Sequence, residues 1–436
     1  MSTIAAIATG PAAGGIGIIR LSGPASLSAA RRVARQLPAS LTPRHAYFTR
    51  FSDADGAVLD EGLLLYFQAP HSFTGEDVVE LHAHGAPRLL SLLLSEVLRE
   101  DDVRPATPGE FTRRAYLSGR IDLSRAEAVA DLVAAESEAQ VRAAAAQLSG
   151  ELTARLEAVH APLLELHADL EGSLDFPEEA EGADQHAGPR LDAALSSVGA
   201  LLADARRGAL IRRGARVVLY GPVNAGKSTL FNALAGASRA LVDAEPGTTR
   251  DTLEARLELA GLAVTLIDTA GLRETTARIE ALGIGRTRDA LAGADIGVLV
   301  LPPETTADQR AAWRAECDDA RRIEVRGKAD LLQAEDELIC VSGQTGQGLE
   351  RLRSALAARL GAGQSAAVLA SSERHLAALE QVEAALRRAK EALELSTIEV
   401  VSGEVGLALE ALTVITGEDA STALLDSIFA RFCIGK

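Results

Sequence analysis

The sequence predicts a multidomain protein: an N-terminal α+β domain, an all-α helical domain, and an α/β domain inserted into the helical one. Short apolar runs separated by turn residues fill the first 118 residues, as in an α+β domain. A glycine-rich loop at mid-chain then lies between a predicted strand and a predicted helix. Leucine-rich helical stripes occur on both sides of this region, which favours an insertion because surface loops tolerate inserted domains. The predicted boundaries are 1–118, 119–213, 214–360 and 361–436.

The composition limits the class of protein. Of the 436 residues, 47% are hydrophobic but only 3% are aromatic, so we expect cores of Leu, Val, Ile and Ala. The formal net charge of −17 argues against a surface that coats a polyanion, so contact with RNA would need a local patch or a partner. Cys317, Cys340 and Cys433 have neither metal-site nor disulfide spacing, which predicts a reducing cytoplasmic setting. We expect no signal peptide, because the N-terminus has no charged region followed by an apolar core. We expect no membrane span, because no run of about 18 apolar residues occurs.

In the N-terminal domain we expect strands at 16–21 and 62–67, and a helix at 89–98 that begins near Pro87. The segment Gly14-Gly15-Ile16-Gly17 is only superficially similar to a dinucleotide-binding fingerprint, because no third glycine has the right offset. We therefore interpret this segment as a tight turn.

The helical domain is predicted from apolar residues that recur every three or four positions. Before the α/β domain they are Leu148, Leu152, Leu156, Val159, Leu163, Leu166 and Leu170; after it they are Leu376, Leu379, Val382, Leu386, Leu393, Leu425, Ile428, Phe429 and Phe432. Ser124 to Glu127 has the form of a helix-capping box, and Pro162 is expected to kink its helix. We expect a loop at 177–189, a helix at 191–202 and a linker at 361–364.

The mid-chain loop from Gly221 to Thr229 matches G-x-x-x-x-G-K-[ST], the phosphate-binding loop (P-loop) of P-loop NTPases. A predicted strand at 215–220 runs into it and a predicted helix at 228–235 leaves it, so a chance glycine-rich turn explains it poorly. The glycines let backbone N–H groups approach phosphates, and the helix N-terminus adds a positive dipole end. We expect Lys227 to reach the β- and γ-phosphates and the Ser228 hydroxyl to bind Mg²⁺.

The segments that follow the P-loop supply the rest of a phosphate and metal site. Further strands are predicted at 263–267, 295–301, 321–325 and 337–341. Asp268-Thr269-Ala270-Gly271 follows the first of them, where a carboxylate can hold the Mg²⁺ shell and the Gly271 N–H can meet the γ-phosphate. The segment 246–251 lies where a switch segment belongs. Its Thr249 can complete the Mg²⁺ coordination only while the γ-phosphate is present.

Base selection is predicted at Lys328-Ala329-Asp330, because the Asp330 carboxylate can accept from two donors on the guanine edge that adenine lacks. Ser342 and Gly343 lie where a second base-contacting loop belongs. Two positions depart from the usual GTPase motifs, since Gly327 replaces an asparagine and Gly343 replaces an alanine. We predict binding of GTP over ATP with weakened affinity, and tighter binding after Gly327→Asn.

The residue that orients the attacking water is not the one that Ras-like proteins use. Leu272 follows the Asp-Thr-Ala-Gly segment at the position of their glutamine, and leucine cannot orient water. Either hydrolysis is very slow or another residue supplies the polar group. Glu280, twelve residues beyond Asp268, is the candidate; the alternative is a glutamate on a solvated helix face.

Several segments together resemble the MnmE (TrmE) family of tRNA-modifying GTPases, and the resemblance covers nearly the whole chain. The segments are 14–23, 72–81, 108–115, 121–123, 126–132 and the terminal Phe432-Cys433-Ile434-Gly435-Lys436. These motifs are far more specific than the P-loop, which many families share. The resemblance implies an N-terminal folate-binding and dimerisation domain, a helical domain, and an inserted Ras-like P-loop G domain.

The resemblance also implies the activity and its residues. It implies GTP hydrolysis that depends on Mg²⁺ and K⁺, with Glu280, Lys227 and Asn224 in catalysis. The implied GTP-contacting residues are Asn224, Ala225, Gly226, Lys227, Ser228, Thr229, Thr248, Thr249, Asp268, Thr269, Ala270, Gly271, Lys328, Asp330, Ser342 and Gly343. The implied Mg²⁺ ligands are Ser228 and Thr249, and the implied K⁺ ligands are Asn224, Asp243, Glu245 and Thr248. The implied contacts to a reduced folate (a tetrahydrofolate derivative) are Arg20, Glu80, Arg120 and Lys436, where Arg120 replaces a common lysine.

By the same resemblance, the protein acts as a homodimer with an FAD- and NADH-using flavoprotein called MnmG or GidA, in a heterotetramer. The pair would add a carboxymethylaminomethyl-type group to C5 of the wobble uridine, position 34, of certain tRNAs.

Two other functions stay open from the sequence. A regulatory GTPase of ribosome assembly would explain the nucleotide motifs but not the N-terminal segments or the terminal Cys-Ile-Gly-Lys. A helical scaffold with a degenerate nucleotide site would explain Gly327 and Gly343. Cys433 is either a nucleophile or a small packed residue near a helix end.

Overall fold

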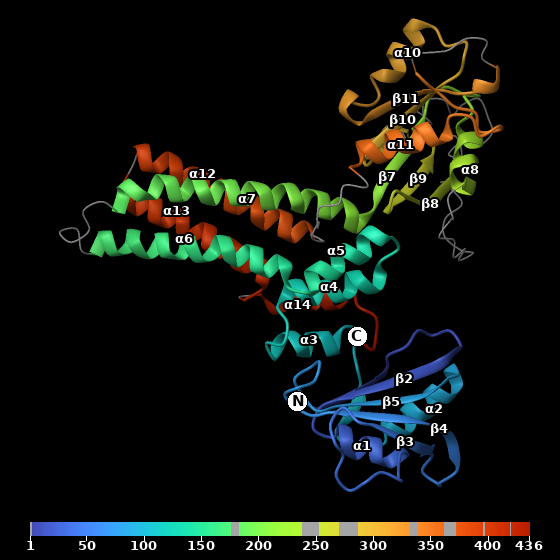
Figure 1. Ribbon diagram of the computed structural model, residues 1–436, viewed down its shortest axis with the longest axis vertical. Coiled ribbons are helices and arrows are strands. Elements are labelled where there is room, and N and C mark those ends of the chain that lie inside the picture. The colour runs from blue at the N-terminus through green and yellow to red at the C-terminus, as the bar shows by residue number, and fades with distance from the viewer. Residues whose placement is uncertain are drawn as a thin grey trace. The chain divides into compact units, whose positions relative to one another are not determined.

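The computed structural model describes residues 2–175, 183–237, 253–269, 287–331, 338–361, 372–395, 397–418 and 420–436 (Figure 1). The chain divides into two compact units. The first unit comprises Met1–Val133, Gln147–Gly199 and Ala377–Lys436, and the second comprises Ala134–Ala146 and Ala200–Leu376. Because parts of the first unit lie on both sides of the second in the sequence, the prediction of an inserted α/β domain is confirmed.

The N-terminal part of the first unit is a six-stranded sheet with strand order β3-β4-β5-β2-β1-β6 (Figure 1). Its strands are β1 (Thr3–Ile7), β2 (Gly14–Ser22), β3 (Ala46–Ser52), β4 (Val58–Phe67), β5 (Val78–Gly85) and β6 (Val103–Pro105). Neighbouring strands are antiparallel except for the parallel pair β1–β6. Helices α1 (Ser26–Val33) and α2 (Pro87–Val97) pack on one face, where alternate strand residues form the core. The predicted strands and helix of this domain are confirmed.

The tight turn predicted at Gly14 to Gly17 is wrong, because these residues begin β2. The pairing of β2 with β5 changes register between Gly14 and Gly17. A Cβ atom placed on Gly17 would lie 2.4 Å from the side chain of Leu90 on α2. The absence of a side chain on Gly17 therefore leaves room for Leu90 of helix α2 to pack against the strand.

The rest of the first unit is helical. Its helices are α3 (Glu110–Leu117), α4 (Leu123–Ala134), α6 (Glu151–Asp175), α7 (Ala183–Arg213), α12 (Glu373–Leu395), α13 (Ile398–Thr416) and α14 (Thr422–Phe429), where α4, α7 and α12 extend into residues of the second. The predicted stripe from Leu152 to Leu170 is buried on α6, which packs against α13. Ser402 on α13 donates a hydrogen bond to Glu171 on α6, and Pro162 lies inside α6 without ending it.

Three local predictions in the helical part are wrong. Leu148 ends α5 (Glu138–Leu148) and does not belong to the α6 stripe. Ser124 does not cap α4: the helix begins at Leu123, and the Arg125 N–H donates to Asp122 Oδ1 at 2.7 Å. The loop predicted at 177–189 overlaps α7, which begins at Ala183 and contains Pro189; residues 177–182 lie outside the described residues.

The second unit contains a six-stranded sheet with strand order β12-β11-β10-β7-β9-β8 (Figure 1). The strands are β7 (Ala215–Tyr220), β8 (Leu253–Leu259), β9 (Leu262–Asp268), β10 (Ile296–Leu301), β11 (Arg322–Arg326) and β12 (Ile339–Cys340). Helices α8 (Lys227–Ala237), α10 (Ala307–Arg314) and α11 (Leu349–Arg359) accompany it. Among the described strands of this sheet, β8 alone is antiparallel to its neighbour. This is the predicted Ras-like α/β topology; β8 is a strand that we did not predict.

The strand order of this sheet predicts where a ligand binds. β7 and β10 pair in the middle of the sheet and are almost wholly buried, as expected for parallel strands covered on both faces. The next parallel strand in the chain, β9, lies on one side of β7, and the one after it, β10, lies on the other side, so the strand order reverses at β7. In open parallel sheets, ligands bind where the strand order reverses, outside the carboxyl ends of the strands. The carboxyl end of β7, where the glycine-rich loop begins, is that position.

Candidate functional site

The P-loop connects β7 to α8, and its glycines are sterically required. A Cβ atom on Gly221 would lie 2.3 Å from the Val300 carbonyl oxygen on β10, and Gly221 and Gly226 both have a positive φ. Asn224 also adopts a positive φ of 60°, which few non-glycine residues do. The loop thus curls at the N-terminus of α8, where backbone N–H groups and the helix dipole favour an anion.

Lys227, the first residue of α8, lies over this loop. Its side chain is buried, and its Nζ donates to the carbonyl oxygens of Gly221 at 3.0 Å and Pro222 at 2.7 Å. These contacts hold the ammonium group at the loop, which is the position from which a lysine can neutralise phosphate charge. Ser228, the next residue, is exposed at the start of the helix.

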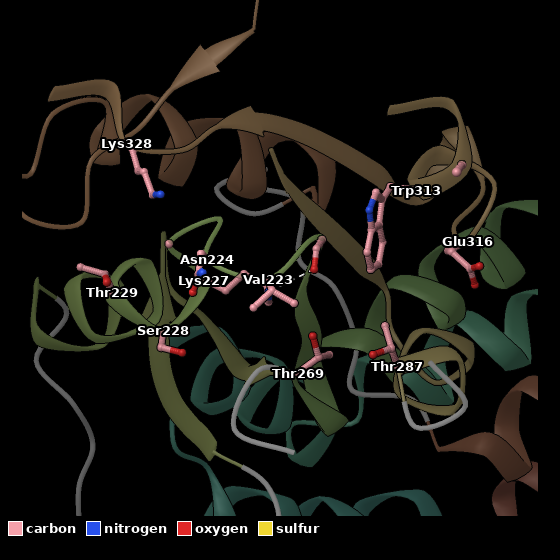
Figure 2. A pocket seen from close by; sticks show the side chains of 13 residues that line it. Val223, Asn224, Lys227, Ser228, Thr229, Thr269, Thr287, Trp313, Glu316 and Lys328 are labelled. Atoms are coloured by element: carbon pink, nitrogen blue, oxygen red, sulfur yellow. Dashed lines mark hydrogen bonds between the residues drawn. The ribbon is translucent and has the colours of Figure 1, made fainter. Parts of the chain in front are cut away.

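A cavity of about 770 Å³ opens above the P-loop. Its lining residues are Gly221, Val223, Asn224, Gly226, Lys227, Ser228, Thr229, Thr269, Thr287, Ala312, Trp313, Glu316 and Lys328. Figure 2 shows Lys328 on one side of the loop, and Trp313 and Glu316 on the other. The volume lies within the roughly 300–1,000 Å³ of small-molecule sites and suits a nucleotide.

Oxygen donors for a metal ion lie at the same crevice. Asp268 ends β9 directly opposite Leu219 of β7, and it is fully buried. The next residue, Thr269, donates from Oγ1 to the Leu219 carbonyl at 2.9 Å, which fixes the chain where it leaves the strand. The Ser228 hydroxyl and the Asp268 carboxylate are oxygen ligands of the kind that Mg²⁺ prefers, so these residues fit this ion.

The predicted base-side residues line a smaller adjoining cavity of about 230 Å³. Lys328 and Asp330 follow β11, and Ser342 and Gly343 follow β12. Both cavities share Gly226, Thr229 and Lys328 as lining residues. The Ala329 N–H donates to the Val341 carbonyl at 3.0 Å, which joins the two loops, and the buried Ser342 hydroxyl accepts from the backbone of its own loop. The structure therefore brings all four residues to one end of the P-loop.

Several predicted site residues lie outside the described residues, and their placement stays a prediction. They are Asp243, Glu245, Thr248, Thr249, Ala270, Gly271 and Glu280, together with Leu272. Of the predicted K⁺ ligands, only Asn224 is described.

Four residues of the cavity lie outside the predicted motifs and were missed by sequence reasoning: Thr287, Ala312, Trp313 and Glu316. The Trp313 ring lies 6.4 Å from that of Tyr220, which directly precedes the P-loop. Hydrogen bonds from Arg288 lower the pKa of Glu316, so its carboxylate is charged at neutral pH. No motif marks these side chains. The one signal was that Trp313 is the single tryptophan in the sequence.

A second group of predicted residues meets on the N-terminal sheet. Arg20 on β2 is the direct cross-strand neighbour of Glu80 on β5, and Arg20 Nε donates to Glu80 Oε1 at 2.9 Å. The second carboxylate oxygen of Glu80 lies 3.1 Å from His82 Nε2, a residue that sequence reasoning missed. The Arg20 guanidinium lies 5.9 Å from the centre of the Phe111 ring, which can support it by a cation–π contact.

The other two predicted folate residues come from separate parts of the first unit. The C-terminal segment packs on the N-terminal sheet, because Gly435 touches the backbone of Ile7 at the end of β1. The half-buried Lys436 therefore lies beside β1, which pairs with the strand that carries Arg20. Arg120 is exposed and lies near Gly75. Cys433 is exposed, and its carbonyl accepts from the Gly109 N–H at 3.4 Å.

The sheet order, the P-loop at its reversal point and the paired base-side loops define a P-loop GTPase domain, here inserted into a helical unit. The family model for the N-terminus of the GTP-binding protein TrmE matches residues 3–120. The family model for the MnmE helical domain matches residues 123–433. The chain belongs to the MnmE (TrmE) family.

Full-length relatives agree with this assignment. The tRNA modification GTPase MnmE of Myxococcus xanthus is 60% identical over 436 residues, which covers 100% of this chain and 99% of the relative. The tRNA modification GTPase MnmE of Azoarcus sp. is 43% identical over 447 residues, which covers 99% and 98%.

Solved structures with similar folds cover only part of the chain. The G domain of the T. maritima FeoB iron transporter is 24% identical over 33% of this chain and 98% of its own, with a TM-score of 0.26. Aquifex aeolicus Era in complex with GDP and AlF4− is 20% identical over 39% and 66%, with a TM-score of 0.28. TM-scores this low carry no argument for function. No helix among the described residues has the length and apolar character that crossing a membrane requires.

Proposed function

We propose that this protein is a GTP hydrolase of tRNA modification that uses Mg²⁺ and K⁺. The observation that carries the proposal is the continuity of the site: the P-loop with Lys227 adjoins Asp268 on one side and the loop that holds Asp330 on the other. A nucleotide fits this arrangement with its phosphates on the loop and its base toward Asp330. The carboxylate of Asp330 then favours guanine, because adenine would leave it unpaired.

The roles of the described side chains follow from their positions. The Lys227 ammonium group exchanges its two backbone carbonyl contacts for phosphate oxygens and offsets their charge. Ser228 and Thr249 would hold Mg²⁺, with Asp268 directly or through water, and the ion would supply positive charge against the phosphates when bound. Asn224, held at a positive φ, would offer its side-chain oxygen to K⁺, with Asp243, Glu245 and Thr248 as the other proposed ligands. Glu280 aligns the attacking water in this proposal.

We also propose the division into domains at 1–118, 119–213, 214–360 and 361–436. The matches to residues 3–120 and 123–433 support the first boundary. The N-terminal domain is proposed to bind a reduced folate through Arg20, Glu80, Arg120 and Lys436. The Arg20–Glu80 pair supports this, since it places both charges at the surface of the sheet, where a polar heteroaromatic ring could use them.

The finer part of the proposal concerns the reaction. The curated relatives are named tRNA modification GTPases, which supports a tRNA substrate. We propose that the protein works in the cytoplasm as a homodimer with an FAD-containing MnmG (GidA) partner and adds a carboxymethylaminomethyl-type group to C5 of uridine 34. The net charge of −17 is consistent with a partner that carries much of the tRNA contact.

The experiment that tests the GTPase compares hydrolysis rates in K⁺ and Na⁺ buffers. We expect faster turnover in K⁺, and we expect Asn224→Ala to remove this difference while GTP binding persists. Asn232→Ala is a matched control, because Asn232 is an exposed asparagine on the neighbouring helix α8. Equal rates in both buffers for the parent protein would refute the role of K⁺.

A genetic experiment tests the tRNA reaction. Nucleoside analysis of tRNA from a strain that lacks this gene should show loss of the modified wobble uridine, and its return when the gene is restored. Unchanged tRNA together with co-sedimentation of the protein with ribosomal subunits would favour a ribosome-assembly GTPase instead.

A further inference from the structure

The two glycines that depart from the GTPase motifs both lie against the backbone of the phosphate site. Gly327 precedes Lys328, and a Cβ atom placed on it would lie 2.4 Å from the Ala225 carbonyl oxygen in the P-loop. The same atom would lie 3.1 Å from Val300 Cγ1. Real Cβ atoms do not approach backbone oxygens within 3.0 Å, so the P-loop or the base-side loop would have to move by at least about half an ångström.

Gly343 has the same relation to the helix that follows the P-loop. A Cβ atom on Gly343 would lie 2.6 Å from both the carbonyl carbon and the carbonyl oxygen of Thr229, and 2.8 Å from the Leu230 nitrogen. All three atoms belong to the backbone of α8, which cannot give way as a flexible side chain could. The second base-side loop therefore rests directly on the helix that holds the phosphate-binding residues.

Space, and not backbone conformation, demands glycine at both positions. Neither Gly327 nor Gly343 has a φ in the left-handed region, so other residues could adopt either backbone without strain. The Gly327 N–H also keeps an ordinary partner, the Leu301 carbonyl at 2.9 Å. An added side chain would break the direct contact between the base-side loops and the P-loop region.

We propose that Gly327 and Gly343 are positioning residues that seat both base-side loops on the P-loop and α8, so that tight nucleotide binding requires glycine at both sites. The inference rests on the proposed GTPase function and deepens it. Ala225, which Gly327 touches, lies in the middle of the phosphate-binding loop, so a shift of its carbonyl moves the peptide groups that face the phosphates. The steric contact reverses the expectation from the motif alone: Gly327→Asn is now expected to weaken GTP binding.

The test measures GTP and ITP affinities of the full chain for the parent, Gly327→Ala and Gly343→Ala. Trp313 lines the cavity and is the single tryptophan, so its fluorescence can report binding directly. Overpacking a filled site commonly costs enough to weaken binding by about tenfold or more. Gly236→Ala is the control, because a Cβ atom there meets nothing within 4 Å and its φ is not positive.

The expected result is a loss of about tenfold or more for GTP in each variant, and a loss for ITP that is no larger, because a displaced base-side loop also displaces Asp330. The melting temperature of the nucleotide-free protein should stay near that of the parent. Parental GTP affinity in both variants would overturn the inference. So would a large fall in melting temperature, which would assign the glycines to folding alone. Failure of the proposed function would look different, as a parent chain that binds no GTP.

Discussion

Replacement of Glu110 by glutamine tests how the N-terminal sheet is joined to the helices that follow it. The Glu110 carboxylate on α3 accepts from the Arg104 guanidinium on β6, from the Arg114 guanidinium at 3.0 Å, and from the Thr107 N–H at 3.0 Å. Arg114 also binds Glu76 and the Ser2 carbonyl. Helix α3 also carries Phe111, whose ring contacts the Arg20 guanidinium. The network that fixes α3 therefore also fixes a contact of the proposed folate site.

The magnitude follows from the pKa of Glu110. Burial alone would raise this pKa, but the hydrogen bonds from Arg104, Thr107 and Arg114 outweigh burial and lower it from 4.5 to about 2. A difference of this size between folded and unfolded states corresponds to about 3 kcal/mol. Because the folded-state pKa is depressed, this stability is present above about pH 4.5 and is lost as the pH falls toward 2. Glutamine cannot ionise, so Glu110→Gln should lose it at neutral pH.

Amide hydrogen exchange over residues 103–117 of the full chain is the suitable assay, because it reports local free energies without requiring all domains to unfold together. We expect exchange from Glu110→Gln to be faster at pH 7 by an amount equivalent to about 3 kcal/mol, and the difference should shrink as the pH approaches 2. Glu61→Gln is the matched control: Glu61 pairs with Arg50 at 2.7 Å, but its side chain is 47% exposed, so the expected cost is below about 1 kcal/mol. Equal costs for the two variants would refute the reasoning.

Two further predictions concern the proposed activities. Glu280→Ala should leave GTP affinity near the parental value and reduce turnover by about 10²-fold, the usual effect of losing a general base or a group that orients the attacking water. Single-turnover kinetics would check this, with Glu254→Ala at an exposed glutamate as the control. Parental turnover in Glu280→Ala would remove Glu280 from the mechanism. Deletion of Cys433 to Lys436 should weaken binding of a reduced folate, since this segment packs on β1, but should leave GTP binding intact. Titration of the truncated protein with each ligand would check this. Unchanged folate affinity would exclude Lys436 from the site.

Much of the fold could be predicted because its signals are local. The stripe on α6 and the continuous apolar run of β7 each encode their element within a few residues. Strand β8 was missed because Leu253-Glu-Ala-Arg-Leu-Glu-Leu is ambiguous: Leu253 and Leu257 are four apart, as on a helix, whereas Leu257 and Leu259 alternate, as on a strand. Only its pairing with β9 decides between the two. Asp122 was missed as a cap because Asp122 and Ser124, two positions apart, are both residue types that can cap the start of a helix.

The candidate site also contains residues that the sequence could predict and residues that it could not. The P-loop could be predicted because its glycines and lysine act through the conformation of one short segment. Trp313 and His82 could not, because they reach their sites only through strand register and helix packing. The contact of Gly327 with Ala225 was also invisible, since a motif comparison counts the lost asparagine side chain but not the backbone that occupies its space.

The discontinuous first unit has a consequence for synthesis of the chain. Leu123 and Ala126 share an apolar cluster with Leu425, Phe429 and Phe432, and the Tyr116 hydroxyl donates to the Gly417 carbonyl. These partners leave the ribosome roughly 300 residues apart, a delay of about 15–60 s at synthesis rates of about 5–20 residues per second. The inserted nucleotide domain can close its own sheet during that interval, whereas Tyr116 on α3 and Leu123 and Ala126 on α4 must wait for their C-terminal partners. A nascent chain of this protein should therefore depend on chaperones until its last helix is released.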